Sequence, residues 1–210
     1  MHVLFVCTGN LCRSPSAEGF FAQLVAEHGP EGVTVSSVGI RGSLRPPPSQ
    51  LLEEGAAFGL DLSEHESHQL DPSDIAGSDL IIGMARDHVR EVIVADSTAF
   101  SKTYTLREIV RRGRAKGPRY PGEPLFEWLL RLGAGRRPMD LVGEAPQDDT
   151  PDPMGGENED FRLMLEEIEA STRFLYSLIW PAPAPAPTPT PGTGATTTTT
   201  TSQTTAESAV

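Results

Sequence analysis

The segment CTGNLCRSP, at positions 7–15, constrains the fold of this chain more than any other part of it. The four residues before it, at positions 3–6, are all apolar and are typical of a buried parallel strand. Gly9 and Asn10 favour a tight turn, because both residue types tolerate a positive φ angle. The final Ser-Pro pair is typical of a first helical turn. The sequence therefore predicts a strand, a tight loop and a helix in immediate succession.

The side chains of this loop suit an oxyanion, and a phosphoryl group is the natural ligand. Backbone N–H groups in such a loop point inward, and the following helix adds the positive end of its dipole. Cys7 is a candidate nucleophile, because a thiolate is favoured at a helix N-terminus beside a cation. Arg13 offers a planar guanidinium that can hold two phosphoryl oxygens, and Ser14 either caps the helix or donates a hydrogen bond to Cys7. We predict that Cys7 and Arg13 are catalytic and that the remaining loop residues bind the substrate: Thr8, Gly9, Asn10, Leu11, Cys12 and Ser14.

The rest of the chain alternates between strand-like and helix-like segments. Apolar or alternating runs at 33–40, 80–84 and 102–106 predict three further strands. Helical patterns follow the loop and recur at 49–58 and 86–94. This alternation indicates a parallel sheet with right-handed crossovers, in which ligands bind at the carboxyl ends of the strands.

The loop sequence resembles the phosphate loop of the low-molecular-weight protein tyrosine phosphatases, a family that includes thiol-linked arsenate reductases and protein arginine phosphatases. The resemblance covers most of residues 1–180 and implies an α/β fold with a four-stranded parallel sheet of order 2-1-3-4 and helices on both faces. It also implies that His65 supports the loop by a hydrogen bond to Asn10, close to Ser37. The other matching segments are SSVGI, GLDLSEHESHQL, SDLIIGMARDHV, KTYTLREIV and PDPMGG.

A proton donor for the leaving group is expected near the end of the folded region. Departure of an alkoxide or phenoxide from phosphorus needs an acid, which a carboxyl group can supply. Asp152 precedes a proline and an amphipathic helical pattern at 161–179, which resembles the Asp-Pro loop of the family. Asp148 and Asp149 are close in sequence, but neither precedes a proline. We therefore predict Asp152 as the third catalytic residue.

The resemblance implies a phosphatase that hydrolyses phosphomonoesters through a cysteinyl-phosphate intermediate, with no metal or other cofactor. Its substrates would be a phosphorylated protein or a small aryl phosphate, and its partners a tyrosine kinase or the substrates of that kinase. The family's phosphotyrosine phosphatases usually carry aromatic residues where this chain has Met154 and, approximately, Ser43. Leu11 replaces the threonine of the arginine phosphatases, which favours protein phosphotyrosine over phosphoarginine.

Two other functions stay open. Arsenate would fit the same loop, and because no cysteine follows Cys12, arsenate reduction would need an external small thiol. The other function is a phosphate-binding scaffold without chemistry, but the presence of Cys7, Arg13 and Asp152 opposes it. Cys12 itself either packs as a structural residue or forms a protective disulfide with Cys7 under peroxide.

Composition narrows the class of protein further. The formal charge of −12 over 210 residues opposes a nucleic-acid partner. No run of 18 apolar residues and no secretory signal pattern occurs, so we expect neither a membrane span nor export. Two cysteines, one of them an expected thiolate, suit a reducing environment, and the predicted location is cytoplasmic.

Three regions are expected along the chain. Residues 1–180 form the catalytic domain, and residues 181–210, rich in proline and threonine, form a disordered tail. A basic insertion occupies about 113–148 and contains an apolar, helix-like run at 125–132 around Trp128. This insertion is interpreted as a solvated loop with a packed helix; the alternative is a lid beside the pocket that recruits acidic substrates.

Overall fold

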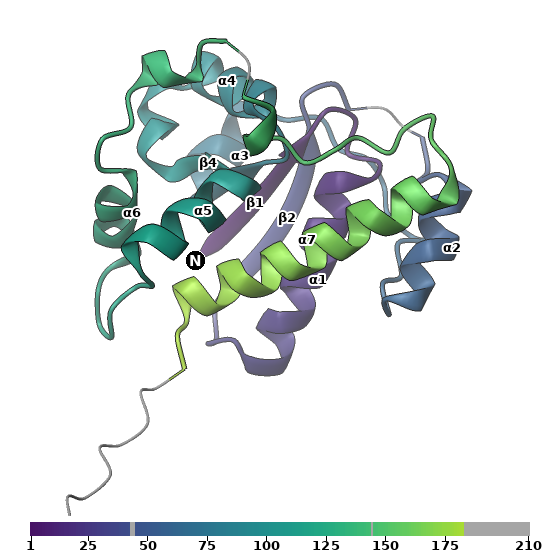
Figure 1. Ribbon diagram of the computed structural model, residues 1–210, viewed down its shortest axis with the longest axis horizontal. Coiled ribbons are helices and arrows are strands. Elements are labelled where there is room, and N and C mark those ends of the chain that lie inside the picture. Colours follow the sequence, from purple (N-terminus) through teal and green to yellow (C-terminus); the bar gives the residue numbers. More distant parts are fainter. Residues whose placement is uncertain (43–44, 144, 183–210) are drawn as a thin grey trace, which may run out of the picture.

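The central strand of the protein is β1 (His2–Cys7), which has a hydrogen-bonded neighbour on each side (Figure 1). The other strands are β2 (Thr34–Gly39), β3 (Leu80–Gly83) and β4 (Thr103–Thr105), and all pairings are parallel. The order is β2-β1-β3-β4, as predicted. The computed structural model describes residues 1–42, 45–143 and 145–182, so Ser43 and residues 183–210 of the predicted tail lie outside the described residues.

Helices cover both faces of the sheet, because side chains alternate along each strand. On one face Phe5 packs edge-on against Phe21, with the ring centroids 5.7 Å apart. The apolar cluster on this face joins α1 (Arg13–His28), α2 (Ser49–Ala57), α5 (Leu106–Lys116), α6 (Leu125–Gly133) and α7 (Asn158–Ile179). A smaller cluster on the opposite face joins α3 (Pro72–Gly77), α4 (Arg86–Ala95) and the 3₁₀ helix η1 (Ser97–Lys102).

The structure adds a helix that the sequence analysis did not predict. The six residues of α3 begin after Asp71, whose carboxylate accepts a hydrogen bond from the backbone N–H of Ser73. Asp74 reaches back to the N–H of Asp71, which completes a capping box with proline at the first helical position. The sequence DPSD carries this signal, but the helix is too short to show a hydrophobic period.

The basic insertion is a packed region in which three of the five arginines form ion pairs: Arg131, Arg136 and Arg137. Trp128 is fully buried on α6, and two 3₁₀ helices follow, η2 (Pro138–Leu141) and η3 (Pro146–Asp148). Arg131 pairs with Glu123 at 2.8 Å. Arg112 and Arg136 both pair with Glu108, at 2.7 and 2.9 Å. The structure favours the interpretation of a packed helix with solvated connections.

None of the helices that the structure describes combines the length and the apolar character needed to cross a membrane.

Candidate active site

The loop between β1 and α1 curls tightly at the carboxyl end of the central strand. Asn10 has a φ angle of 54°, a left-handed conformation that asparagine tolerates better than most residues. This turn directs the Asn10 backbone N–H at Cys7 Sγ, at 3.1 Å. The Ser14 hydroxyl donates to the same sulfur at 3.0 Å. Of the two predicted roles for Ser14, the structure therefore shows the hydrogen bond to Cys7, and two donors stabilise negative charge on the sulfur.

The end of β2 runs directly against this loop. Cys7 lies opposite Gly39 in the sheet register. The pairing continues beyond the strand, since the backbone N–H of Ile40 donates to the carbonyl of Cys7 at 2.9 Å and that of Arg41 to the carbonyl of Thr8 at 2.8 Å. A Cβ atom on Gly39 would lie only 2.8 Å from the backbone N of Asn10. Glycine is therefore required at this position for close approach of the two backbones.

The buried side chain of Asn10 links the loop to the elements behind it. Its Nδ2 donates to Ser37 Oγ at 2.7 Å, and its Oδ1 accepts from the backbone N–H of His68 at 2.8 Å. His65 Nε2 donates to the backbone oxygen of Asn10 at 2.8 Å. This contact confirms the predicted hydrogen bond from His65 to the loop asparagine.

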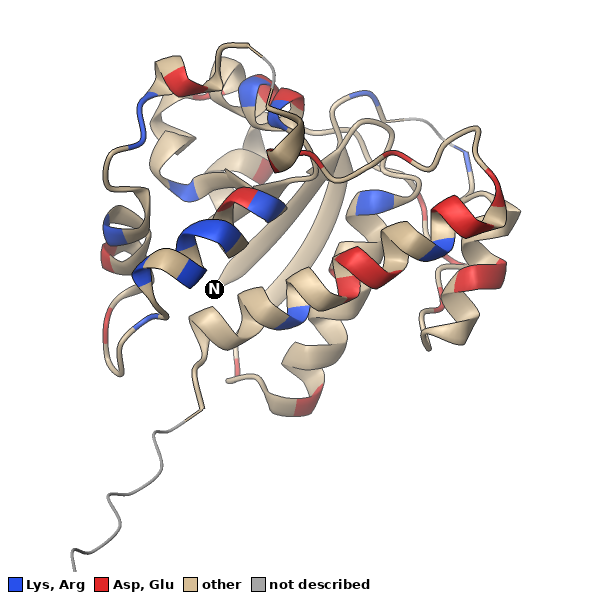
Figure 2. Cartoon of the chain, in the orientation of Figure 1, with Lys and Arg blue, Asp and Glu red and all other residues tan. Residues whose placement is uncertain are grey.

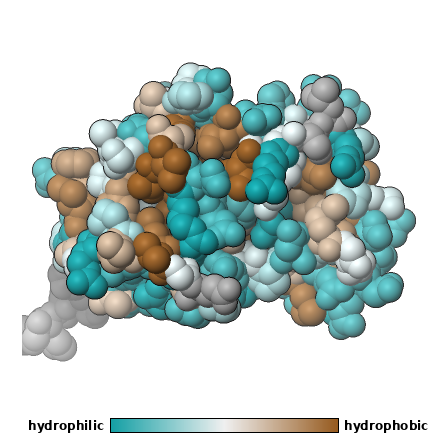
Figure 3. Space-filling model, turned by 90° about the horizontal axis from the view of Figure 1, so that it is seen from above, coloured by the Kyte–Doolittle hydropathy of each residue, from teal (hydrophilic) through white to brown (hydrophobic). Residues whose placement is uncertain are grey.

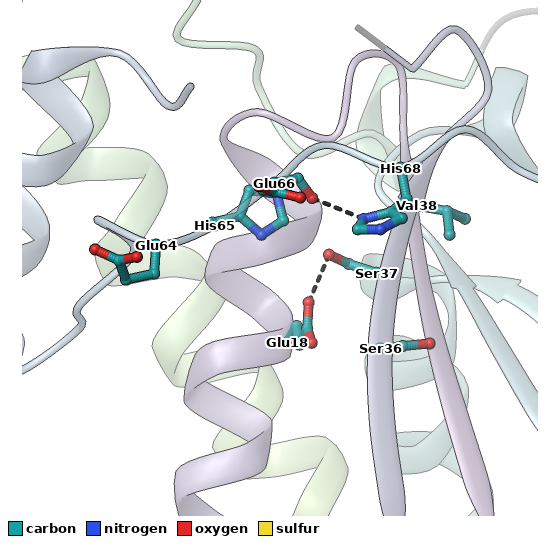
Figure 4. Close-up of a pocket in the computed structure, with 8 residues that line it drawn as sticks. All are labelled: Glu18, Ser36, Ser37, Val38, Glu64, His65, Glu66 and His68. Atoms are coloured by element: carbon teal, nitrogen blue, oxygen red, sulfur yellow. Dashed lines mark hydrogen bonds between the residues drawn. The ribbon is translucent and has the colours of Figure 1, made fainter. Parts of the chain in front are cut away.

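A cavity of about 460 Å³ lies beside this supporting network (Figure 4). Ser37 and His65 both line it, and the Ser37 hydroxyl donates to Glu18 on α1 at 2.6 Å. Burial raises the pKa of Glu18, while the hydrogen bond from Ser37 acts in the opposite direction. The chain of hydrogen bonds therefore runs from Glu18 through Ser37 to Asn10.

Arg13 is the cation of the loop, and its side chain is almost entirely buried. Its Nη2 lies 2.6 Å from Asp152 Oδ2 and 3.3 Å from Thr8 Oγ1. The other acidic residues of this segment are engaged elsewhere, because Asp148 pairs with Arg111 and Asp149 accepts from the backbone N–H of Arg86. Of the three acids that the sequence offered, Asp152 is the one beside Arg13.

A histidine that the sequence analysis did not single out touches the same loop. His88 is buried, and its Nδ1 accepts from the backbone N–H of Ala85 at 2.9 Å. Its Nε2 therefore carries the proton and donates to Thr8 Oγ1 at 3.0 Å. Burial, together with the nearby charge of Arg13, lowers the pKa of His88 to about 3. A neutral His88 thus positions Thr8 beside Arg13.

The pocket itself has a volume of about 340 Å³ and opens over Cys7. Asn10 and Ser14 lie behind it and support the loop. Figure 3 looks onto this end of the molecule, where hydrophilic residues predominate and the hydrophobic areas are separate. No residue of 113–148, as far as that region is described, lines the pocket. Its lining residues are Cys7, Thr8, Gly9, Leu11, Cys12, Arg13, Arg41, Arg45, Asp152 and Met154.

The second cysteine lies against Met154, with Cys12 Sγ 3.5 Å from Met154 Sδ. Burial raises the pKa of the Cys12 thiol to about 12, and the neighbouring Cys7 and Asp152 add to the effect. Cys12 is therefore a neutral thiol at physiological pH, and it differs in this respect from the predicted role of Cys7. Met154 stands where the family resemblance implies an aromatic wall.

Comparison with known proteins assigns the chain to a family. The family model described as low molecular weight phosphotyrosine protein phosphatase matches residues 2–129. The chain belongs to the low molecular weight phosphotyrosine protein phosphatase family. The match ends before Asp152, so the position of Asp152 in this phosphatase family member is known from the structure alone.

Individual relatives of this phosphatase family agree with that assignment. The chain is 35% identical over 109 residues to the probable low molecular weight protein-tyrosine-phosphatase EpsP of Ralstonia solanacearum, covering 51% of this chain and 71% of the relative. It is 33% identical over 116 residues to the protein-arginine-phosphatase of Bacillus subtilis, covering 52% and 73%. The crystal structure of a low molecular weight protein tyrosine phosphatase from T. tengcongensis superimposes with a TM-score of 0.63 at 27% identity, covering 84% of this chain and 98% of the other.

Proposed function

We propose that this chain is a protein-tyrosine-phosphatase that hydrolyses phosphomonoesters through a cysteinyl phosphate. One observation carries the proposal: Cys7 Sγ, with two hydrogen-bond donors, lines a single pocket with the paired side chains of Arg13 and Asp152. A nucleophile, a cation for the phosphoryl oxygens and an acid for the leaving group are the parts that this reaction needs.

In the first step, Cys7 Sγ forms a bond to phosphorus while the bond from phosphorus to the substrate oxygen breaks. Arg13 and the loop N–H groups hold the equatorial oxygens, where charge develops. Asp152 gives its proton to the departing oxygen. The products of this step are the dephosphorylated alcohol or phenol and a cysteinyl phosphate.

In the second step, the Asp152 carboxylate takes a proton from a water molecule. The water oxygen bonds to phosphorus as the bond from phosphorus to Cys7 Sγ breaks, which releases inorganic phosphate and the thiolate. Ser14 and the Asn10 N–H stabilise the thiolate as a leaving group through the same hydrogen bonds that they make in the structure.

Protein phosphotyrosine is the substrate that we favour within this reaction class. The pocket, with a volume of about 340 Å³, has room for a phosphoryl group, and Leu11 and Met154 line it. A tyrosine kinase or its substrates would be the partners, and the two free cysteines suit a cytoplasmic location. Phosphoarginine is the second candidate, because one relative is a protein-arginine-phosphatase at 33% identity. Arsenate reduction with an external thiol is the third reaction that the same loop could support.

Hydrolysis of 4-nitrophenyl phosphate without added metal tests the chemistry. Wild type should turn over, while Cys7→Ser should lose all activity above background. Asp152→Ala should lose about 10²- to 10⁴-fold in kcat, the usual contribution of a general acid. Asp149→Asn is the matched control and should retain most activity, because its carboxylate contacts only the backbone N–H of Arg86 among its described hydrogen bonds.

Substrate choice is a separate measurement. Phosphotyrosine and phosphoarginine peptides of the same sequence should be hydrolysed with kcat/KM in favour of phosphotyrosine. A well-folded wild type that hydrolyses neither peptide nor the aryl phosphate, but reduces arsenate with a small thiol, would replace this proposal with the reductase.

A further inference from the structure

Two arginines stand at the mouth of the pocket with no partner among the described residues. Arg41 and Arg45 line the cavity around Cys7, and both are exposed. Neither side chain makes a hydrogen bond or an ion pair with any part of the chain that the structure describes. Figure 2 shows the positive charge on both sides of the short grey trace between β2 and α2.

Their position relative to the loop follows from the backbone. The Arg41 N–H donates to the Thr8 carbonyl at 2.8 Å, so the start of this side chain is fixed next to the second residue of the phosphate loop. The close approach that Gly39 permits brings it there. Arg45 borders the same pocket beyond the β2 end, and also a neighbouring hollow of about 390 Å³ that Glu64 and Glu66 line.

Most of the other arginines that the structure describes form ion pairs; Arg86 and Arg119 are among the exceptions, but neither lines this pocket. Arg107 pairs with Glu167, Arg131 with Glu123, and Arg162 with Glu159 and Glu166. The chain as a whole carries a charge of −12, so carboxylates are abundant. Two guanidiniums beside one pocket, neither with a partner among the described residues, therefore add positive charge at the entrance of that pocket in an acidic protein.

We infer that Arg41 and Arg45 bind a second anionic group of the substrate, next to the phosphoryl group held by Arg13. The inference rests on the proposed phosphatase function and names its substrate class: phosphotyrosine segments with a carboxylate or a second phosphate close to the phosphorylated residue. Guanidinium groups suit both anions, because each presents oxygens to a planar fork. Met154, rather than an aromatic residue, lines the pocket, so ring stacking contributes little to substrate selectivity. The charges of Arg41 and Arg45 supply that selectivity instead.

The test compares three phosphotyrosine peptides of equal length: one with neutral flanks, one with Asp and Glu flanks, and one with neutral flanks and a phosphoserine. Wild type should hydrolyse the preferred anionic peptide with a kcat/KM about three- to thirtyfold higher than that for the neutral peptide. This is the gain expected from two exposed charge contacts. The advantage should shrink as salt rises. The two anionic peptides distinguish a carboxylate from a phosphate as the second group.

The variants then assign the effect. A double variant, Arg41→Gln with Arg45→Gln, should hydrolyse the three peptides with similar kcat/KM values. The loss for the anionic peptides should come mainly from a higher KM. Arg119→Gln removes one charge away from the pocket and should keep the wild-type ranking. Hydrolysis of 4-nitrophenyl phosphate, which carries no second anion, reports the underlying chemistry. If wild type hydrolyses this ester but shows no preference among the peptides, or if the preference survives in the double variant, the inference is wrong while the phosphatase function stands. If wild type does not hydrolyse 4-nitrophenyl phosphate at all, the proposed phosphatase function is wrong.

Discussion

Arg13 Nη2 and Asp152 Oδ2 lie 2.6 Å apart, although 138 residues separate these two positions in the chain. The guanidinium is almost fully buried, whereas the Asp152 side chain is 44% exposed. A phosphoryl group that binds Arg13 must therefore compete with the Asp152 carboxylate. Once displaced, the carboxyl group is free to face the leaving-group oxygen. Asp152 should therefore assist catalysis but weaken the binding of anions to Arg13.

Replacement of Asp152 by asparagine or alanine should change these two quantities in opposite directions. The kcat for an aryl phosphate should fall about 10²- to 10⁴-fold, because the acid is lost. Inorganic phosphate should inhibit these variants several-fold more tightly than wild type, because Arg13 no longer has a competing carboxylate. Steady-state kinetics with phosphate as inhibitor give both values, and weaker inhibition of the variants would contradict the competition.

Addition of one methyl group at Gly39 should damage the site. The new Cβ would lie 2.8 Å from the backbone N of Asn10 and 2.8 Å from the carbonyl carbon of Gly9, both part of the loop. We expect kcat/KM of Gly39→Ala to fall by at least about tenfold, as misplacement of binding groups weakens catalysis. Gly77→Ala is the control, because its Cβ would meet nothing within 4 Å. Equal kcat/KM values for the two variants would show that the loop can shift to accommodate the methyl group without loss of activity.

The buried His88 should make the protein sensitive to mild acid. The unfolded histidine takes up a proton below pH 6.5, while the folded one does not until about pH 3, because burial and Arg13 oppose its charge. The folded state therefore loses stability as pH falls from 6.5 towards 3. Above pH 6.5 His88 is neutral in both states and does not change the stability. The expected loss is about 1.4 kcal/mol per pH unit, or about 2 kcal/mol between pH 7 and pH 5.

Chemical denaturation at several pH values measures this sensitivity. The decline in the free energy of unfolding between pH 7 and pH 5 should be about 2 kcal/mol smaller for His88→Asn than for wild type. The comparison cancels other titrating groups such as Glu18, whose raised pKa acts in both proteins. Parallel curves for wild type and His88→Asn would mean that His88 takes up a proton as readily in the folded state as in the unfolded state, which would contradict the prediction.

Oxidation by peroxide tests the second role of Cys12. The neutral Cys12 thiol can condense with a sulfenic acid formed on Cys7, which yields a disulfide and water and blocks further oxidation. Wild type should then recover activity when a thiol reductant is added, whereas Cys12→Ser should recover little. Recovery of Cys12→Ser equal to that of wild type would leave Cys12 as a packing residue against Met154.

The sequence predicted what depends on local chemistry. The strand, loop and helix around Cys7 and Arg13 follow from neighbouring residues, and the sheet order followed from the family resemblance. The turn at Asn10 likewise follows from the conformational tolerance of its own residue type.

The features that the sequence missed depend on contacts between distant residues. His88 reaches Thr8 across 80 positions, and Gly39 matters only because β2 ends against the loop. Arg41 and Arg45 become notable only once their lack of partners beside Cys7 is visible. No periodicity or motif in the sequence marks such contacts in advance.

The long helix α7 separates the site from the end of the described chain. It starts six residues after Asp152 and crosses the sheet to the side where β1 begins (Figure 1). Trp180 is held there by ring contacts with Phe21 and Tyr176, at centroid distances of 6.1 and 4.9 Å. An anchor, label or fused domain attached beyond Trp180 would therefore start on the face opposite to the pocket. Attachment of the protein to a surface through this point would leave the pocket around Cys7 directed away from that surface.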